Sequence, residues 1–147
     1  MEFSVKVREC AELYNSSVAG IKFNDAGTTI AIAQILYAVR PIVESYETQR
    51  KELLDKYGKT DPDTQELVVK DRDVQFKTPQ DRKAFESDHK KLLETVTTVT
   101  VPKLDSSRIN GDGLTPIALL VLVPFGLRLA DQDVTPTAQP APAPNLN

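Results

Sequence analysis

The sequence predicts an α+β domain, mainly α, in which a long antiparallel helical hairpin carries a small β-hairpin or sheet element and a short buried C-terminal helix. Three observations predict this class. Apolar residues recur every three or four positions from Thr28 to Tyr57 and again within Pro79–Glu94. A β-branched run, Val96–Val101, favours a strand. The 147 residues, 40% of them hydrophobic, are enough for one modest core.

The chain opens with a pattern that favours a strand followed by a helix. Apolar and polar residues alternate over residues 3–7, and a helix is expected from Glu9 onward. Glycines and an Asn-Asp pair then indicate a loop over residues 16–27, with Ile21 and Phe23 as its buried anchors.

The strongest signal is the apolar stripe of the expected helix Thr28–Tyr57. Its members are Ile32, Ile35, Leu36, Val39, Ile42, Val43, Tyr46, Leu53 and Tyr57. Gly58 suits a left-handed cap at the end of this helix. Pro41 lies inside it and predicts a kink or two abutting helices. Polar residues crowd in after Tyr46, so the distal half should project from the core or pack on one narrow seam.

The next segments read as turn, connector and second helix. Lys59–Thr64 has turn composition, and Glu66–Lys77 reads as a small β-hairpin or an extended connector. Thr78-Pro79 is a helix start, because threonine can cap and proline favours the first helical position. In the strand Val96–Val101, which follows this second helix, we expect threonine on the solvent face and valine on the buried face.

Thr115-Pro116 repeats the cap-plus-proline start, and the residues that follow are apolar nearly all round. The short helix Pro116–Val123 should therefore be buried. We place the domain at residues 1–130. Residues 131–147 form a Pro/Ala-rich extended tail, whose composition cannot bury enough surface to fold alone.

The composition narrows the classes of partner. The 18 basic and 21 acidic residues give a net charge of -3, so nothing favours the phosphate contacts of a nucleic-acid-binding protein. The first ten residues contain no apolar run of the kind a secretory signal needs. The longest apolar run, residues 116–127, is too short to span a membrane. We therefore expect no membrane partner, and the charge balance gives no reason to expect nucleic acid as a partner.

Single copies of cysteine and histidine leave little room for site chemistry. They exclude a disulfide framework and a metal site built mainly from Cys and His. His89 has Asp88 beside it, but Ser106 and Ser107 lie in no recognisable nucleophile motif, so we interpret His89 as a partly buried helix residue. Cys10 is interpreted as a small buried residue. No catalytic residue, no metal site and no cofactor is expected, and the protein is interpreted as not an enzyme.

Three acidic turns superficially resemble metal-binding spacings. They are Asp61 with Asp63, Asp71 with Asp73, and the loop Asn110–Gly113. None continues into a calcium loop, because the required glycine and bidentate glutamate offsets are missing or a cation intervenes. Solvated turns are the default interpretation for all three.

Two sets of residues are candidates for binding. The apolar segment near the tail either closes the core or forms an interaction surface, made of Ile117, Leu119, Leu120, Leu122, Phe125 and Leu127. Basic residues on the two long helices would bind a phosphate-bearing ligand if the protein sequesters one, although a solvated helical face is the commoner reason for such charges. These residues are Arg50, Lys51, Lys90 and Lys91.

The order of features resembles a loose group of small, mostly uncharacterised proteins encoded by tailed bacteriophages. The resemblance lies in VKVRECAELYNS, GIKFNDAG, the long helix ending ELLDKYG, the Phe85…Leu92-Leu93 helix, TVTVPKL, and Leu114-Thr115-Pro116 with Leu119-Leu120. It covers residues 5–125 and is one of layout; the Pro/Ala tail departs from the usual ending of the group.

Three functions follow as hypotheses. The first is a non-enzymatic phage structural or accessory protein that acts through protein–protein contacts and self-assembly, as a homo-oligomer or a subunit of a larger assembly. The second is an anti-defence inhibitor or a protein that sequesters a small ligand such as a nucleotide. The third is a hydrolase using His89. The resemblance implies the host cytoplasm during infection as the location, or the virion.

Overall fold

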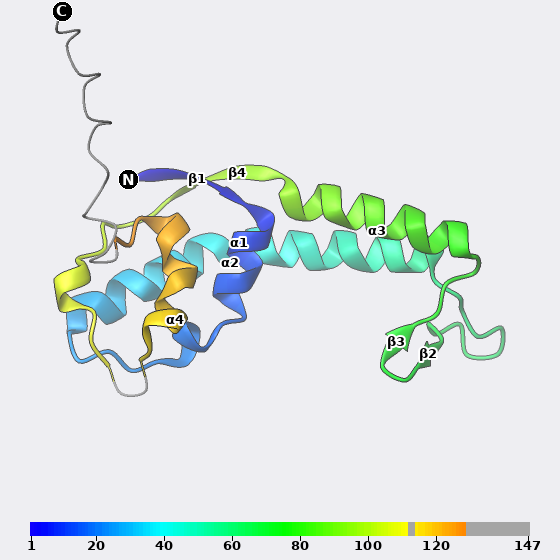
Figure 1. The fold of residues 1–147 in the computed structure, drawn as a ribbon, viewed down its shortest axis with the longest axis horizontal. Coiled ribbons are helices and arrows are strands. Elements are labelled where there is room, and N and C mark those ends of the chain that lie inside the picture. Colours follow the sequence, from blue (N-terminus) through cyan, green and yellow to red (C-terminus); the bar gives the residue numbers. More distant parts are fainter. Residues whose placement is uncertain (112–113, 129–147) are drawn as a thin grey trace, which may run out of the picture.

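The computed structural model describes residues 1–111 and 114–128, and it has the expected class, α+β and mainly α (Figure 1). The tail 131–147, with Asp112 and Gly113 of the expected loop, lies outside the described residues. The elements are β1 (Glu2–Lys6), α1 (Val7–Tyr14), η1 (Ser17–Gly20), α2 (Ala26–Tyr57), β2 (Val69–Lys70), β3 (Asp73–Val74), α3 (Pro79–Glu94), β4 (Val96–Thr100), η2 (Ser106–Arg108), α4 (Pro116–Leu119) and η3 (Leu120–Phe125), where η marks a 3₁₀ helix.

The molecule consists of a core at one end and an arm at the other (Figure 1). The core contains α1, the first half of α2, the β1–β4 sheet and the C-terminal helices. The arm is the second half of α2 laid antiparallel to α3, with the β2–β3 hairpin at its tip. The expected helical hairpin is therefore present, and its distal half projects from the core.

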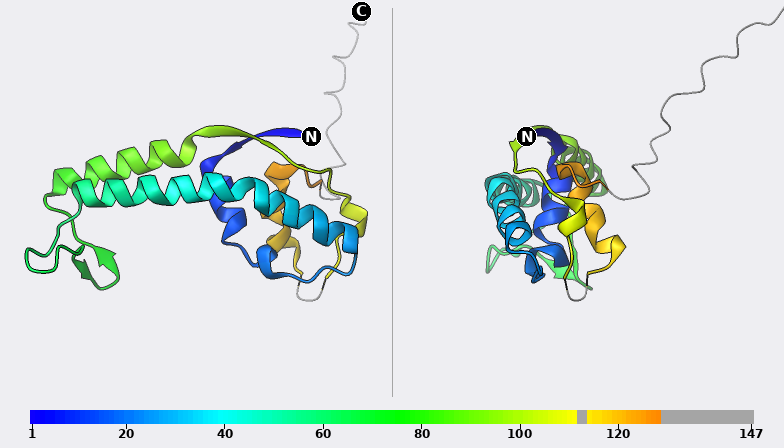
Figure 2. Two further views of the ribbon diagram at one scale, coloured as in Figure 1. Left: turned by 180° about the vertical axis from the view of Figure 1, so that it is seen from behind. Right: turned by 90° about the vertical axis from the view of Figure 1, so that its left-hand side faces the viewer.

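Helix α2 is continuous over 32 residues, including Pro41. The Asp25 carboxylate caps its start by accepting a hydrogen bond from the Thr28 N–H at 2.8 Å. Pro41 is exposed, and so is Tyr37, the residue whose carbonyl loses its helical hydrogen-bond partner. The helix consequently bends between its core half and its arm half instead of breaking in two (Figure 2).

The left-handed cap expected at Gly58 is wrong. Gly58 has φ -72° and ψ 149°, which is extended backbone, and it forms a β-bridge with Phe76. The reason for glycine here is space: a Cβ would lie 2.5 Å from the Leu54 carbonyl oxygen and 2.5 Å from the Leu67 side chain. The chain thus passes directly from α2 into the extended tip of the arm.

The connector is a β-hairpin, the first of the two forms expected. Val69 pairs with Val74 and Lys70 pairs with Asp73 in an antiparallel register. The two turn residues, Asp71 and Arg72, have φ values of 52° and 67°. Positive φ at both central positions defines a type I′ turn, whose twist matches that of a two-residue hairpin.

Helix α3 begins as the sequence predicts. The Thr78 hydroxyl accepts a hydrogen bond from the Asp81 N–H at 3.1 Å, and Pro79 occupies the first turn. No residue of α3 is fully buried. This helix packs on α2 through a single half-buried seam. Such a seam is expected because, in the arm, each helix packs mainly against the other helix.

Strands β1 and β4 form a two-stranded antiparallel sheet that joins the N-terminal segment to the segment directly after α3. The register pairs Glu2 with Thr100 and Lys6 with Val96. Helix α1 follows at once, beginning at residue 7, two residues earlier than expected. The expected face pattern is wrong at Val96, which is 62% exposed, because the inward face of β4 continues through Val99 to Val101 and therefore includes Thr97.

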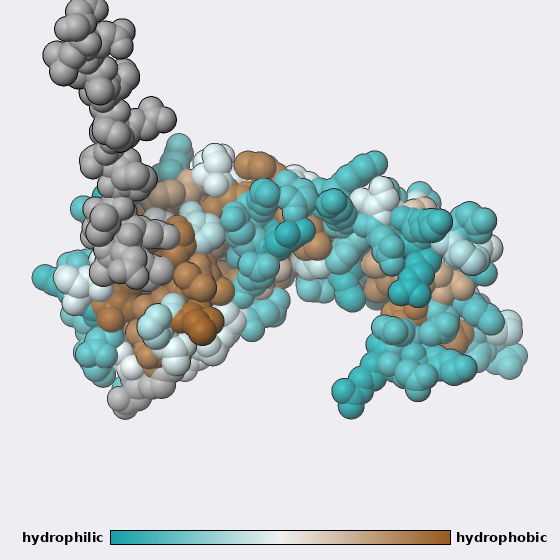
Figure 3. Space-filling view, in the orientation of Figure 1, coloured by the Kyte–Doolittle hydropathy of each residue, from teal (hydrophilic) through white to brown (hydrophobic). Residues whose placement is uncertain are grey.

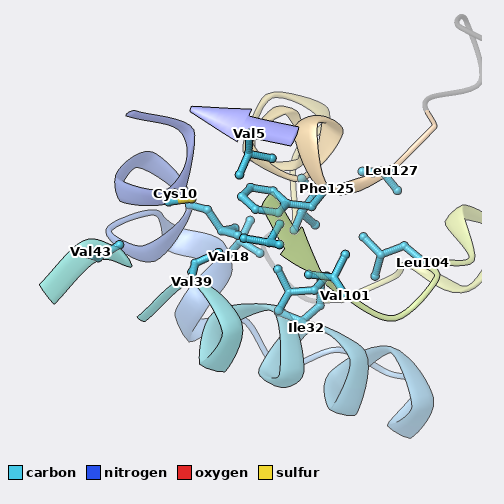
Figure 4. Close-up of a cluster of buried hydrophobic side chains, with 14 of the residues drawn as sticks. Val5, Cys10, Val18, Ile32, Val39, Val43, Val101, Leu104, Phe125 and Leu127 are labelled. Carbon is cyan, nitrogen blue, oxygen red and sulfur yellow. The ribbon is translucent and has the colours of Figure 1, made fainter. Parts of the chain in front are cut away.

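The core lies between α2, α1, the sheet and the C-terminal helices (Figure 4). Phe125, Leu13, Ile35 and Leu122 are its largest fully enclosed side chains. Phe23 is buried as an anchor of the N-terminal loop and bridges to Gly111. No buried side-chain nitrogen or oxygen lacks a hydrogen-bond partner in residues 1–111 and 114–128. Burying these polar atoms therefore leaves no unmade hydrogen bond in this part of the chain.

Candidate functional site

The structure divides the apolar C-terminal segment into a core half and a surface half. Leu122, Phe125 and Leu127 are buried in the core, so assigning them to an interaction surface is wrong. Leu119 is half-buried against the core. The two that remain on the surface are Ile117, 78% exposed, and Leu120, 51% exposed, and apolar side chains gather there over α4 and η3 (Figure 3).

The division follows from a change of helical period. Thr115 caps α4 by accepting from the Ala118 N–H at 3.2 Å, but after four residues the chain tightens into the 3₁₀ helix η3. In a 3₁₀ helix, residues three apart lie above one another. One row therefore runs inward through Leu122 and Phe125, while Ile117 and Leu120 form an outward row. The expectation of a helix buried all round was wrong for this outward row. We call Ile117 and Leu120 the α4 patch.

The basic set does not line one hollow. Arg50 lines a hollow of about 250 Å³ at the tip of the arm, together with Arg72, Arg82 and two phenylalanines. Lys91 lines a separate hollow of about 420 Å³ between α2 and α3. Lys51 and Lys90 are exposed on the same two helices. Sequence reasoning missed Arg72 and Arg82, because only the folded hairpin brings them beside Arg50.

His89 belongs to the seam between the arm helices. Its ring stacks on Phe85, with centroids 5.3 Å apart, and its Nε2 lies 2.8 Å from the Tyr46 hydroxyl, where either group can donate according to the tautomer. Burial lowers the pKa of His89, the charge of Arg50 lowers it further, and Glu47 opposes the shift. The ring is therefore neutral at pH 7 and joins two helices.

The hydroxyls that a hydrolytic site would need lie elsewhere. Ser106 and Ser107 are in η2, at the end of the core far from the arm (Figure 1). The Ser107 hydroxyl donates to Asp105 at 2.6 Å. The structure therefore does not bring His89 together with the serines that the sequence offered as nucleophiles.

Cys10 is fully buried in α1, as the sequence predicts. Burial raises the pKa of its thiol to about 11, with a smaller contribution from Glu9. A thiol with this pKa carries almost no thiolate at neutral pH, and thiolate is the reactive form. The arrangement fits a packing role.

The acidic residues form turns. Asp61 Oδ1 accepts from the Asp63 N–H at 2.8 Å, which closes a local turn with its own backbone. Asp71 lies at the exposed hairpin turn. In the described ranges, 1–111 and 114–128, no three His, Cys, Asp or Glu side chains come together as a possible metal site.

A second apolar surface, which sequence reasoning missed, lies on the outer face of α2. Ile30 is 58% exposed, Tyr37 is 79% exposed, and Ala33 is exposed between them. These residues are three and four apart, so they share one helical face, opposite the buried stripe. Figure 2 shows that none of the helices and strands in residues 1–111 and 114–128 covers this face of α2. We call Ile30, Ala33 and Tyr37 the α2 face.

The same helix is the one described helix that is long and apolar enough to cross a membrane by length and composition alone. Its most apolar 18-residue window has a mean hydropathy of 1.4. Only 28% of that window is buried. The core helix of a soluble protein meets the same criterion, and the inner stripe of α2 does pack in the core. The finding shows how much apolar surface α2 keeps outside the core.

Comparisons with known proteins add no relative: no protein-family model, no curated protein and no solved structure matches this chain.

Proposed function

We propose that this protein is a non-enzymatic structural or accessory protein of a tailed bacteriophage, which acts through protein–protein contacts and self-assembly. One observation carries the proposal: large apolar side chains are exposed in groups on two faces of a domain whose core is complete. The groups are the α2 face and the α4 patch.

The grouping matters because single exposed apolar residues are normal on any surface. Here, Ile30 and Tyr37 share one side of a helix, and Ile117 and Leu120 share another. Poor packing is not the reason for the exposure, since Ile35, Leu122 and their neighbours beneath are fully buried. Surfaces of this kind mark sites of contact with other macromolecules.

The phage assignment rests on the resemblance in layout over residues 5–125, and it is the basis for proposing the host cytoplasm or the virion as the location. The sequestering alternative draws less support, because the basic residues named for it do not line one hollow. The hydrolase alternative draws less still, because His89 is engaged in the seam of the arm.

Light scattering coupled to size-exclusion chromatography of the full chain tests self-assembly. The expected result is a mass above that of one chain, rising toward a fixed multiple as the protein concentration rises. A mass that stays at one chain over the whole concentration range refutes self-assembly. The neighbouring genes test the phage role: flanking virion genes support it, whereas flanking early genes favour the anti-defence alternative.

A further inference from the structure

We propose that the outer edge of β4 and the adjoining α2 face bind a second copy of this chain, so that the two-stranded sheet becomes a four-stranded sheet in the order β1–β4–β4′–β1′ across a two-fold axis. This inference rests on the self-assembly proposed above, and it names the surface that carries it. Two neighbouring features support it, one in the backbone and one in the side chains.

The backbone feature is the unpaired edge of β4. Met1 and Val101 exchange both of their backbone hydrogen bonds, and Val7 donates to the Thr95 carbonyl at 2.9 Å. Antiparallel ladders alternate between bonded and non-bonded pairs. Given the register, the N–H and C=O groups of every second residue of β4 therefore point away from β1. These residues are Val96, Thr98 and Thr100, and no backbone partner for their N–H groups exists among residues 1–111 and 114–128.

The two edges of this sheet differ in how they are protected. The β1 edge carries the charges of Glu2 and Lys6, and the Lys6 N–H donates to Glu9 Oε2 at 2.7 Å. Charges and local hydrogen bonds of this kind are how proteins prevent edge-to-edge pairing. The β4 edge has neither device, since its residues are valine and threonine alone. It is therefore the edge that is open to another strand.

The side-chain feature lies on the same side of the molecule. Strand β4 packs over α2, and a groove of about 400 Å³ between them is lined by Pro41, Ile42, Ser45, Val96 and Thr97 among others. Seen along the molecule, α2 and β4 lie toward one side of the core and α4 toward the other (Figure 2). A partner that pairs with the β4 edge would therefore also cover the groove and approach the α2 face.

Symmetry and charge favour a second copy as this partner. With the axis at Thr98, Val96 of one chain lies opposite Thr100 of the other, and Thr98 lies opposite itself. The pairing adds about six ladder hydrogen bonds. Neither β4 nor residues 26–39 of α2 contain a charge, in a chain with 27% charged residues. Two copies therefore bring no like charges together within these segments, and a charged partner finds no opposite charge in them. A two-stranded sheet is also marginal alone and gains from further strands.

The decisive experiment uses the position that lies on the axis. The Thr98 side chain is exposed, so Thr98→Lys and Thr98→Glu leave the fold of one chain intact. Each substitution places two like charges opposite each other in the dimer, which destabilises a cross-strand pair. Sedimentation equilibrium of each variant alone should show a dimer dissociation constant at least tenfold above that of the wild type. An equimolar mixture should form a heterodimer, because lysine then faces glutamate.

A matched control adds the same charge on the opposite side of the core. Ile117→Lys is also at an exposed residue and should leave the dissociation constant unchanged. If Ile117→Lys separates the copies while Thr98→Lys does not, the α4 patch is the interface and the inference is overturned. If the two Thr98 variants separate alone but fail to pair when mixed, the two-fold axis at Thr98 is overturned.

The failures of the two proposals can be told apart. Thr98 variants that associate as tightly as the wild type overturn the β4 edge and leave self-assembly standing. A wild type that stays monomeric at every concentration overturns both. Tyr37→Lys tests the helical half of the surface independently and should also weaken association, whereas wild-type affinity in that variant would remove the α2 face from the interface.

Discussion

Substituting Phe125 by alanine tests whether the C-terminal segment closes the core. Phe125 is fully buried among the side chains of the core cluster. Removing about 150 Å² of buried aromatic surface at about 25 cal/mol per Å² costs about 4 kcal/mol. Core Phe→Ala substitutions cost about 3–5 kcal/mol by direct comparison. This is a large fraction of the roughly 5–15 kcal/mol by which a domain is stable.

Urea unfolding followed by circular dichroism measures this loss as a lowered midpoint at an unchanged slope. Chain concentration is held fixed, because self-association would shift the apparent stability. The control is Ile117→Ala, eight residues earlier and 78% exposed, which should change the free energy of unfolding by no more than about 0.5 kcal/mol. A Phe125→Ala variant within about 1 kcal/mol of the wild type would refute the assignment of this segment to the core.

Three further predictions concern single sites. Gly126→Ala should destabilise the fold by about 1–3 kcal/mol or more, because φ is +96° and a Cβ would lie 2.5 Å from the Phe3 ring; thermal melting equal to that of Gly20→Ala, where no atom lies within 4 Å, would contradict this. The Cys10 thiol should resist a thiol reagent until urea unfolds the chain, because it is buried with its pKa raised to about 11; native-state reaction at the rate of a free thiol would contradict this. Burial lowers the pKa of His89 below the ordinary histidine value of 6.5, so the unfolded chain binds more protons just below that pH. The free energy of unfolding should therefore fall as pH drops from 7 through this window, and His89→Gln should flatten that part of the profile; an unchanged slope would argue against a neutral, seam-bound His89.

Features coded within a few residues could be predicted from the sequence. Thr78-Pro79 and Thr115-Pro116 both begin helices, because cap and proline act on the backbone next to them. The buried apolar stripe of α2 could also be predicted, since the spacing of three and four residues that reveals it lies within one helix. Gly58 shows the limit of such local rules: a glycine after a helix suggested a left-handed cap, but the approach of Leu67 from the next segment is what excludes a side chain.

Features set by distant contacts could not be predicted. Both strands of the sheet were expected, but no local pattern indicates that Lys6 pairs with Val96, or that Val96 then faces solvent. The candidate site divides in the same way. Ile117 and Leu120 were named from sequence, whereas Ile30 and Tyr37 were passed over. Whether the outer face of an apolar helix is covered depends on which elements fold against it. The sequence of that helix alone does not indicate which elements these are.

The pairing of β1 with β4 also sets the order in which the growing chain can fold on the ribosome. Lys6 emerges about 90 residues before its partner Val96. Because the chain is synthesised at roughly 5–20 residues per second, β1 lacks its partner strand for about 5–18 seconds. Phe125 is added later still. From their own synthesis until the end of this interval, the uncharged residues 26–39 of α2 have neither the sheet nor the C-terminal helices to cover them. The nascent chain is therefore most open to chaperones, and to neighbouring nascent chains, before its final quarter has been made.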